Sequence, residues 1–535
     1  YEMLHVSAMI LPLMFIAIVF VFALIIFIIA MVIIHFSVRN FIMTNMKNTA
    51  IMEASGYTVR EMVLILLCQL TTVAFTGSLL GSLLGAASIG KMSVIILLTL
   101  GLPWNQPVDP FMVFLTVAGL TLLVGGLTLL IGREYRKTTV LEALRGGINA
   151  HNFKKNRFPF EKSIFPTAVT LALKETFGRF RSQIGVIFII MILSAAVLLG
   201  LGIADTFSDD DTVISMAGVD NADAVVSGDR AMEANLKTMS TVRSVYGDTW
   251  DGLNYTSKKI RKEQTITTRA FTDTSEIRGL AIAEGRLPIH PNEMIFATNA
   301  ALRMKVKTGD TVTVRRGDRE ESFLVTGLCQ VLNNMGYMAY MTAEGMERVT
   351  GNLDRFDYYA CLNRGCSLDD FEKEFHELYP DNEVVDFKEN VQGTIGIVKL
   401  GIRAVSLIIA ALTSLIVAFV ESLIIRTQIT RSLRNLGVSK ALGYTSGQLI
   451  VQTMVSNLPA VLIGMIPGIL LAAFYGGTVM KIMFAFFGFR KAPFFINKGS
   501  YLIAAVLIAG VALLISGIMG MRIRKLEPVK MITEE

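Results

Sequence analysis

Seven long apolar stretches alternate with polar segments of very unequal length along this chain. Each stretch is long enough to cross a bilayer of about 30 Å as a helix of roughly 20 residues. The pattern therefore predicts a membrane α-helical bundle with seven transmembrane helices. We expect these helices at 8–36, 63–89, 111–132, 183–204, 397–425, 448–475 and 499–521.

The longest polar segment, 205–396, has a different periodicity. Short runs such as Thr311–Arg315 and Ser322–Thr326 alternate apolar and polar residues and are separated by turn residues, which is typical of strands. We predict one α+β domain here. His290 and His376 stand in no ordered motif, so we predict no catalytic residue. Three successive aspartates, 209–211, are compatible with a bound cation or a solvated linker; we favour the linker and predict no metal site.

The composition is that of a membrane protein, and the charged residues are distributed unevenly along the chain. The chain is 52% hydrophobic and 18% charged, with a mean hydropathy of +0.54. Residues 205–396 contain 32 acidic and 21 basic residues, a net charge of −11, whereas the whole chain carries +6. The remainder therefore carries +17, which predicts that the domain and the basic loops lie on opposite sides of the membrane.

The basic loops set the expected orientation. Segment 133–182 contains eleven Lys or Arg and four Glu, which predicts a cytoplasmic location. Alternation then places 37–62, 426–447 and the C-terminal tail in the cytoplasm and 205–396 outside, in a multi-pass protein of the bacterial plasma (inner) membrane. The basic loop 476–498 falls outside and is an exception to the rule. The same parity places Tyr1 outside, so we expect further N-terminal sequence, with a first helix, before it.

The chain repeats itself after 387 residues. This shift aligns Gly56-Tyr57-Thr58 with Gly443-Tyr444-Thr445 and pairs of glycines in the following helices. A unit of three helices with a basic loop after the first therefore occurs twice. The expected organisation is a first repeat at 1–147, a basic cytoplasmic linker at 148–182, a helix at 183–204, the extracytoplasmic domain at 205–396 and a second repeat at 397–535.

Small residues recur at four-residue spacing in the second helix of each repeat. This spacing permits close approach of two helices, either within the bundle or at a subunit interface. The residues are Gly77, Gly81, Gly85, Gly464 and Gly468.

Each basic loop contains a segment that fits a short helix ending at a glycine, Gly56 or Gly443. In the second loop, 427–442, residues Ile429, Leu433, Leu436 and Lys440 share one face, which predicts a short amphipathic helix along the inner membrane surface. Such a helix could be a lipid anchor. Two equivalent loops would also suit a partner that has two equivalent subunits.

Several of these segments resemble one known family. The phrase Arg434-Asn-Leu-Gly-Val-Ser-Lys-Ala-Leu-Gly-Tyr-Thr445, its echo at 47–58, the basic segment 172–181, and the related tails at 136–145 and 524–532 are similar to those of FtsX-like and MacB-like permeases of ABC transporters. Parts of the domain, such as Gly285-Arg-Leu-Pro288 and Glu293-Met-Ile, resemble the periplasmic domain of the same family.

This resemblance implies a permease subunit whose cytoplasmic loops couple to a separate ABC ATPase dimer. Asn48 and Asn435 replace an acidic residue of many family members, so no charge pair is expected there. The residues that the resemblance assigns to ATPase coupling are Lys47, Asn48, Gly56, Tyr57, Arg434, Asn435, Ala441, Leu442, Gly443 and Tyr444.

No nucleotide site is expected in this chain. Gly85–Lys91 fits the first seven positions of a P-loop, but Met92 replaces the Ser or Thr that would hold Mg²⁺, and the match lies in an apolar helix. We therefore expect no enzymatic activity and no cofactor here, and ATP and Mg²⁺ in the partner ATPase.

Three functions are compatible with this organisation. The first is movement of the domain by ATP hydrolysis in order to export or extract a peptide, a lipid or a lipoprotein. The second is mechanical regulation of a cell-wall hydrolase or a sensor kinase without transport. The third, a secondary transporter, needs ionisable residues near the membrane midplane, whereas Lys399, Arg403 and Glu421 are expected near helix ends. Nucleic acid is not implied.

The cysteines leave one question open. Cys361 and Cys366 lie on the expected outer side, where a disulfide between them and two free thiols are both compatible with the spacing.

Overall fold

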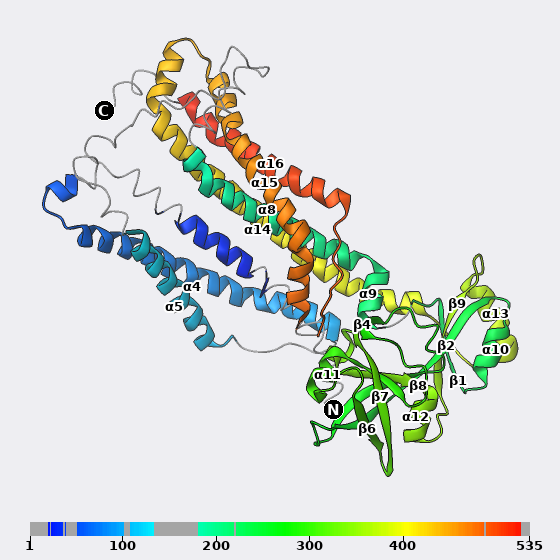
Figure 1. Ribbon diagram of the computed structural model, residues 1–535. Helices are drawn as coiled ribbons and strands as arrows, with labels where there is room; N and C mark the ends of the chain where they lie inside the picture. The colour runs from blue at the N-terminus through cyan, green and yellow to red at the C-terminus, as the bar shows by residue number, and fades with distance from the viewer. Residues whose placement is uncertain are drawn as a thin grey trace. The chain divides into compact units, whose positions relative to one another are not determined.

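The computed structural model confirms a bundle of apolar helices joined to an α+β domain (Figure 1). It describes residues 20–21, 23–35, 38, 51–100, 108–132, 180–218, 221–485 and 488–525. Six of the described helices are long and apolar enough to cross a membrane. They are α4 (Val59–Leu100), α5 (Pro110–Gly132), α8 (Phe180–Ser208), α14 (Phe387–Ala441), α15 (Ser446–Phe484) and α16 (Lys498–Gly520). Of the seventh expected helix, 8–36, the structure describes the shorter apolar helix Ala23–His35.

In the first repeat, α4 and α5 pack closely because small residues of α5 face α4. A Cβ atom on Gly132 would lie 2.9 Å from Cγ1 of Val63, and one on Gly125 would lie 3.3 Å from Cγ2 of Thr71. The three glycines of α4 that were predicted to pack against another helix have open space around them. A Cβ atom on Gly77, Gly81 or Gly85 would meet no atom within 4 Å in the described part of the chain.

In the second repeat, the second half of α14, the start of α15 and the 3-10 helix η5 (Met521–Lys525), which follows α16, share a core of buried aliphatic side chains. This core consists of Ile425, Ile429, Leu449, Ile450 and Ile523. Helix α8 packs on the middle of α15, where a Cβ atom on Gly464 would lie 2.6 Å from the carbonyl oxygen of Ile187. Gly468 likewise approaches Met191 and Ser194 of α8. Equivalent glycines in the two repeats therefore have different surroundings.

The expected short helix at 427–442 is wrong as a separate element. It is the end of α14, which continues without a break for 55 residues. Ile429 is buried and the Lys440 Nζ donates to the Ile523 carbonyl at 3.1 Å, so this face packs on α15 and the end of α16. Protein neighbours, and not lipid, cover the apolar face that the sequence pattern indicated.

The α+β domain contains a ten-stranded sheet with the order β10-β1-β9-β2-β3-β8-β5-β7-β4, and β6 pairs with β2 and β7. Most neighbours are antiparallel, but β3 with β8 and β5 with β7 are parallel. The strands are β1 (Ala224–Gly228), β2 (Val242–Ser257), β3 (Gln264–Phe271), β4 (Ala281–Gly285), β5 (Glu293–Ala297), β6 (Thr311–Arg316), β7 (Arg319–Gln330), β8 (Met338–Thr342), β9 (Phe356–Leu362) and β10 (Val384–Asp386).

Short helices connect the strands and cover the sheet. They are α9 (Asp210–Ala217), α10 (Met232–Thr238), α11 (Thr298–Met304), α12 (Ala343–Thr350) and α13 (Leu368–Leu378). Strand β9 alternates fully between buried and half-buried residues, as expected for a strand with one face on a core. The expected strands at 311–315 and 322–326 correspond to β6 and the middle of β7.

The three successive aspartates are exposed, as expected of a solvated segment, but they begin a helix and do not form a linker. Asp209 caps α9 by accepting from the Thr212 amide at 3.0 Å, Asp210 pairs with Lys399, and Asp211 accepts from Asn221 at 2.8 Å. Helix caps of this kind satisfy amides that have no partner in the first turn. Cys361 and Cys366 are both free thiols.

A buried ion pair links two central strands of the sheet. Arg269 of β3 bonds to Asp248 of β2, and both residues are less than a tenth exposed. The guanidinium also lies 5.6 Å from the ring centre of Phe271 and donates to the Gly218 carbonyl at 3.4 Å. The charge of Asp248 is therefore compensated only while Arg269 remains in place.

We predict that Asp248→Ala lowers the free energy of unfolding of the α+β domain by about 3–5 kcal/mol, because it leaves a buried guanidinium without its partner. Urea unfolding of the full chain, followed by the fluorescence of Trp250, measures this change. Asp251→Ala is the matched control, since Asp251 pairs with Arg316 at an exposed position and its loss should cost less than about 1 kcal/mol. Equal effects of the two substitutions would contradict the prediction.

Candidate coupling site

The turn between α14 and α15, which we call the second tip (residues 438–448), is built around one glycine. Gly443 has φ 95°, a left-handed conformation that residues with a side chain rarely adopt. Its amide donates to the Lys440 carbonyl at 3.0 Å, and the Tyr444 amide donates to the Ser439 carbonyl at 3.1 Å. These two bonds form a Schellman motif, which ends α14 at this position.

The turn before α4, the first tip (residues 51–61), has the same construction. Gly56 has φ 100°, its amide donates to the Glu53 carbonyl at 3.0 Å, and the Tyr57 amide donates to the Met52 carbonyl at 3.1 Å. Each of these residues lies 387 positions before its counterpart in the second tip. The sequence repeat is therefore also a repeat of backbone conformation.

The helix after each tip begins with the same cap. At the first tip, the Thr58 amide donates to the Glu61 carboxylate at 2.8 Å, and the Glu61 amide donates to the Thr58 hydroxyl at 3.4 Å. At the second tip, Thr445 and Gln448 exchange equivalent bonds at 2.9 and 3.2 Å. Both are capping boxes, so each tip fixes where one helix ends and the next one starts.

The two tips present apolar side chains to solvent. Tyr57 is 48% exposed, Tyr444 is 53% exposed and Leu442 is 75% exposed. Exposed apolar groups gathered at one place commonly mark a surface that binds another molecule. Each tip thus combines a rigid backbone with an exposed aromatic ring.

The predicted coupling residues are distributed unevenly over the described structure. Gly56, Tyr57, Ala441, Leu442, Gly443 and Tyr444 all lie at the tips and are exposed. Arg434 and Asn435 lie in α14, about one turn before the start of the second tip. Lys47 and Asn48 lie outside the described residues, as do most of the expected basic linker and the tail from 526.

A segment between α15 and α16, which we call the strap (residues 488–497), binds the α+β domain. The Lys491 amide donates to Oε1 of Gln330 at 2.8 Å, and Nε2 of Gln330 donates to the Lys491 carbonyl at 3.2 Å. The Arg490 amide bonds to the same Oε1, and its side chain pairs with Glu284 of β4 at 3.2 Å. Gln330 is buried, so these contacts fix the strap at the end of β7.

The other half of the strap lies against helix ends. A Cβ atom on Gly202 of α8 would lie 2.6 Å from Cζ of Phe494, and the same ring lies against Gly476 of α15. The Phe495 amide donates to the Thr206 hydroxyl at 3.2 Å. Residues 202–406 and 475–496 accordingly form one compact unit. The basic residues of this loop, which did not fit the expected orientation, include Arg490, which pairs with the acidic domain.

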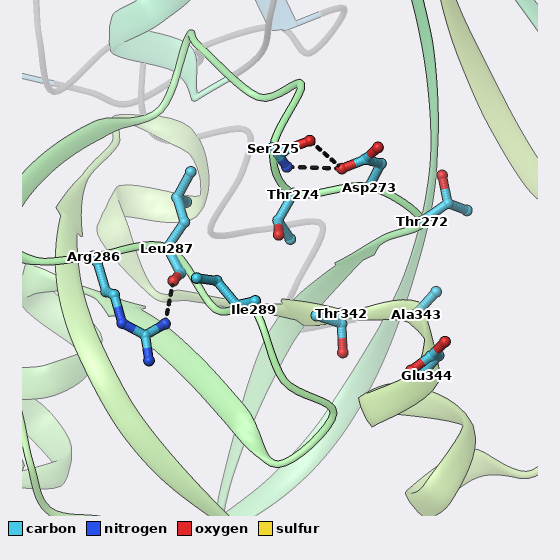
Figure 2. A pocket seen from close by; sticks show the side chains of 10 residues that line it. All are labelled: Thr272, Asp273, Thr274, Ser275, Arg286, Leu287, Ile289, Thr342, Ala343 and Glu344. Atoms are coloured by element: carbon cyan, nitrogen blue, oxygen red, sulfur yellow. Dashed lines mark hydrogen bonds between the residues drawn. The ribbon is translucent and has the colours of Figure 1, made fainter.

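The α+β domain also has an open cavity of about 510 Å³ at the carboxyl ends of the parallel strands β3 and β8 (Figure 2). Three segments line it, namely the turn after β3, the loop after β4 and the start of α12. The lining residues are Thr272, Asp273, Thr274, Ser275, Arg286, Leu287, Ile289, Thr342, Ala343 and Glu344.

One wall of the cavity is held by an ion pair. The two terminal nitrogens of Arg286 donate to Glu293 at 2.6 and 2.7 Å, and the Ile289 and His290 amides donate to the same carboxylate at 2.9 and 3.2 Å. The Arg286 guanidinium, together with these amides, lowers the pKa of Glu293 from 4.5 to about 2. Since Arg286 is already paired, the carboxylates of Asp273 and Glu344 dominate the charge of the cavity.

Sequence reasoning identified the tips but missed the strap and the cavity. The Gly-Tyr-Thr repeat was a sufficient signal for the tips. The sequence signals for the Arg286–Glu293 pair were the two segments 285–288 and 293–295, which the structure brings together. Nothing in the pattern around Gln330 indicated that a segment about 160 positions away would bind it. Among the described residues, no group of three His, Cys, Asp or Glu side chains is placed to hold a metal ion.

The comparisons with known proteins agree with the repeat. Residues 20–140 and 407–528 each match the family model described as the FtsX-like permease C-terminal. A comparison with curated protein sequences gives no match.

Among solved structures, the chain is similar to the periplasmic region of MacB from Actinobacillus actinomycetemcomitans, with 15% identity over 34% of this chain and 95% of that one and a TM-score of 0.27. It is also similar to the extracellular domain of the noncanonic ABC-type transporter YknZ from Gram-positive bacteria, with 12% identity over 31% of this chain and 100% of that one and a TM-score of 0.25.

The Glu293 carboxylate predicts a pH dependence. Because folding lowers its pKa, the pair stabilises the domain fully above about pH 4.5, and this contribution of about 3 kcal/mol is lost as the pH falls towards 2. Glu293→Gln should therefore lower the unfolding temperature at neutral pH and have little effect near pH 2. Thermal unfolding of both proteins as a function of pH tests this, and a difference that does not change with pH would contradict it.

Gln330→Leu should release the strap, because it leaves the amides of Arg490 and Lys491 without their acceptor. The loss of about 1–3 kcal/mol predicts amide hydrogen exchange at these residues that is about ten-fold faster or more. Exchange measured by mass spectrometry on the full chain checks this. Glu284→Gln, which removes only the exposed ion pair, is the control and should change exchange by much less. Unchanged exchange in Gln330→Leu would show that Gln330 does not hold the strap.

Proposed function

The chain belongs to the FtsX-like permease family, and on that premise we propose that it is the membrane subunit of an ABC transporter that receives a separate ATPase dimer on its two tips. ATP and Mg²⁺ would then bind to the ATPase. Hydrolysis would move the tips, and the membrane helices would pass this movement to the α+β domain. The tips would lie in the cytoplasm and the domain outside.

The equivalence of the two tips is the observation that carries this proposal. Both have a left-handed glycine, the same two Schellman bonds and the same capping box, and both expose a tyrosine. Two sites of the same shape suit a partner with two equivalent subunits. A lipid anchor would not require a common backbone geometry.

Two further features support transmission to the domain. Helix α14 runs without interruption from Phe387, directly after β10, to Ala441 at the second tip. The strap adds a second connection, because it joins the end of α15 to β7 through Gln330. A displacement of the second tip would thus reach the domain along two separate segments.

We assign the transported molecule to the classes of peptides, lipids and lipoproteins, for export or extraction. Within these classes, the cavity favours a peptide with a basic group, since Asp273 and Glu344 line it and Arg286 is occupied by Glu293. Hydrophobic side chains, Leu287 and Ile289, border the same cavity and suit an aliphatic stem. Regulation of an external hydrolase or kinase would use the same movement without a transported molecule.

The proposal predicts that charge reversal near the tips weakens capture of the ATPase. Arg434→Glu should reduce affinity about ten-fold or more, which corresponds to an interfacial contact of about 1–3 kcal/mol, and combination with Lys47→Glu should reduce it further. Pull-down of the ATPase by the detergent-solubilised chain measures this loss.

Arg490→Glu is the matched control for this prediction. It reverses a charge in the strap, on the other side of the membrane in this proposal, and should leave capture of the ATPase unchanged. Undiminished capture by the Arg434→Glu, Lys47→Glu double variant would refute the coupling role of the tips. Loss of capture by Arg490→Glu as well would indicate a general defect of folding.

A further inference from the structure

A single carboxylic acid is buried inside the second membrane repeat. Glu421 lies within the apolar span Lys399–Thr430 of α14 and is 1% exposed. Neither of its carboxyl oxygens has a hydrogen-bond partner in the described part of the chain. The sequence interpretation, which placed this residue near a helix end, is therefore wrong.

No counter-charge faces this group from the described helices. Arg426 follows five residues later on α14, which places it about 140° around the helix, and it is exposed. The only charged residue of α15 is Lys481, near the far end of that helix, and the only one in α16 is Lys498, at its start. In α8 the charged residues are Arg181 and Asp205, close to its two ends.

An ionised carboxylate without a partner would cost several kcal/mol in such surroundings. A bound proton removes this charge. It also turns the carboxyl group into a hydrogen-bond donor, which needs an acceptor nearby.

The register of α14 against α15 indicates an acceptor at the level of Glu421. Gln428 of α14 donates to Ser456 of α15 at 3.0 Å, which fixes the antiparallel register. Seven residues before Gln428 is Glu421, and seven residues after Ser456 is Ile463. The carbonyl of Ile463 would normally accept from the amide of residue 467, but Pro467 has no amide hydrogen.

The first repeat lacks both halves of this arrangement. The residue 387 positions before Glu421 is Ile34, and the residue 387 positions before Pro467 is Leu80. The first repeat therefore has neither the acid nor the free carbonyl. The acid and the proline occur together in the second repeat and are absent together from the first.

From this we infer that Glu421 is a proton-binding site inside the membrane, in which the protonated carboxyl group donates to the Ile463 carbonyl that Pro467 leaves free. The proton comes from water and returns to water when movement of α14 against α15 exposes the carboxyl oxygen. Helix α8 covers α15 at Gly464, next to Ile463, and helps to exclude water in the described conformation. This inference does not depend on an ATPase partner.

Infrared difference spectroscopy tests the site directly on the full chain in lipid nanodiscs. The spectrum of the unaltered protein minus that of Glu421→Gln should contain the carbonyl band of a protonated carboxyl group at neutral pH. Glutamine has the same shape and can still hydrogen bond, so this variant should fold. Absence of the band would show that Glu421 is ionised and would overturn the inference.

Two proline variants identify the acceptor. Pro467→Leu introduces the residue of the first repeat and restores an amide for the Ile463 carbonyl, so the carboxyl band should shift to higher frequency as its hydrogen bond is lost. Pro459→Thr, which introduces Thr72 of the first repeat at the other proline of α15, is the matched control and should leave the band in place. An unshifted band in Pro467→Leu, or equal shifts in both variants, would exclude the Ile463 carbonyl as the partner.

Discussion

The dominant constraint on this protein is that a backbone in hydrocarbon must satisfy its own hydrogen bonds. Helices meet this requirement along their length but leave four amides open at their N-terminal end and four carbonyls open at their C-terminal end. Every turn of the membrane part therefore needs local chemistry that closes these groups. The two tips provide it in the same way, with a left-handed glycine for the carbonyls and a capping box for the amides. Caps of other kinds would close these groups as well, so the agreement of the two tips bond for bond reflects the duplication.

Duplication fixed the backbone of the two repeats more strictly than their side chains. The tips agree bond for bond, whereas a Cβ atom on Gly464 or Gly468 would clash with α8 and one on Gly77, Gly81 or Gly85 would meet no described atom within 4 Å. The core of the first repeat includes Val38, Leu66 and Ile131, while position 421 of the second holds a carboxyl group where the first has an isoleucine. The two repeats thus share the backbone conformation of their tips but differ in the side chains between their helices.

The sequence predicted the apolar helices, the alternating domain and the tips because each depends on neighbouring residues. Period and length identify a membrane helix, and glycine followed by Tyr-Thr identifies a tip. The continuity of α14 could not be predicted so easily, since the change from apolar to basic residues near Arg426 resembles a boundary, although no proline occurs before Gly443 and Gly437 remains within the helix. The burial of Glu421 and the binding of the strap by Gln330 depend on segments far away in the chain. Pairings of that kind leave no local pattern.

Helix α14 is far longer than a membrane requires. At about 1.5 Å per residue its 55 residues extend for roughly 80 Å, compared with a hydrocarbon core of about 30 Å. A straight helix of this length that pivots near its middle behaves as a lever with two arms of about 40 Å. A tilt of about 10° then displaces each end by roughly 7 Å in opposite directions, more than the rise of one helical turn. The part of α14 that exceeds the thickness of the bilayer would thus convert a small rotation of the helix into a large displacement of both helix ends.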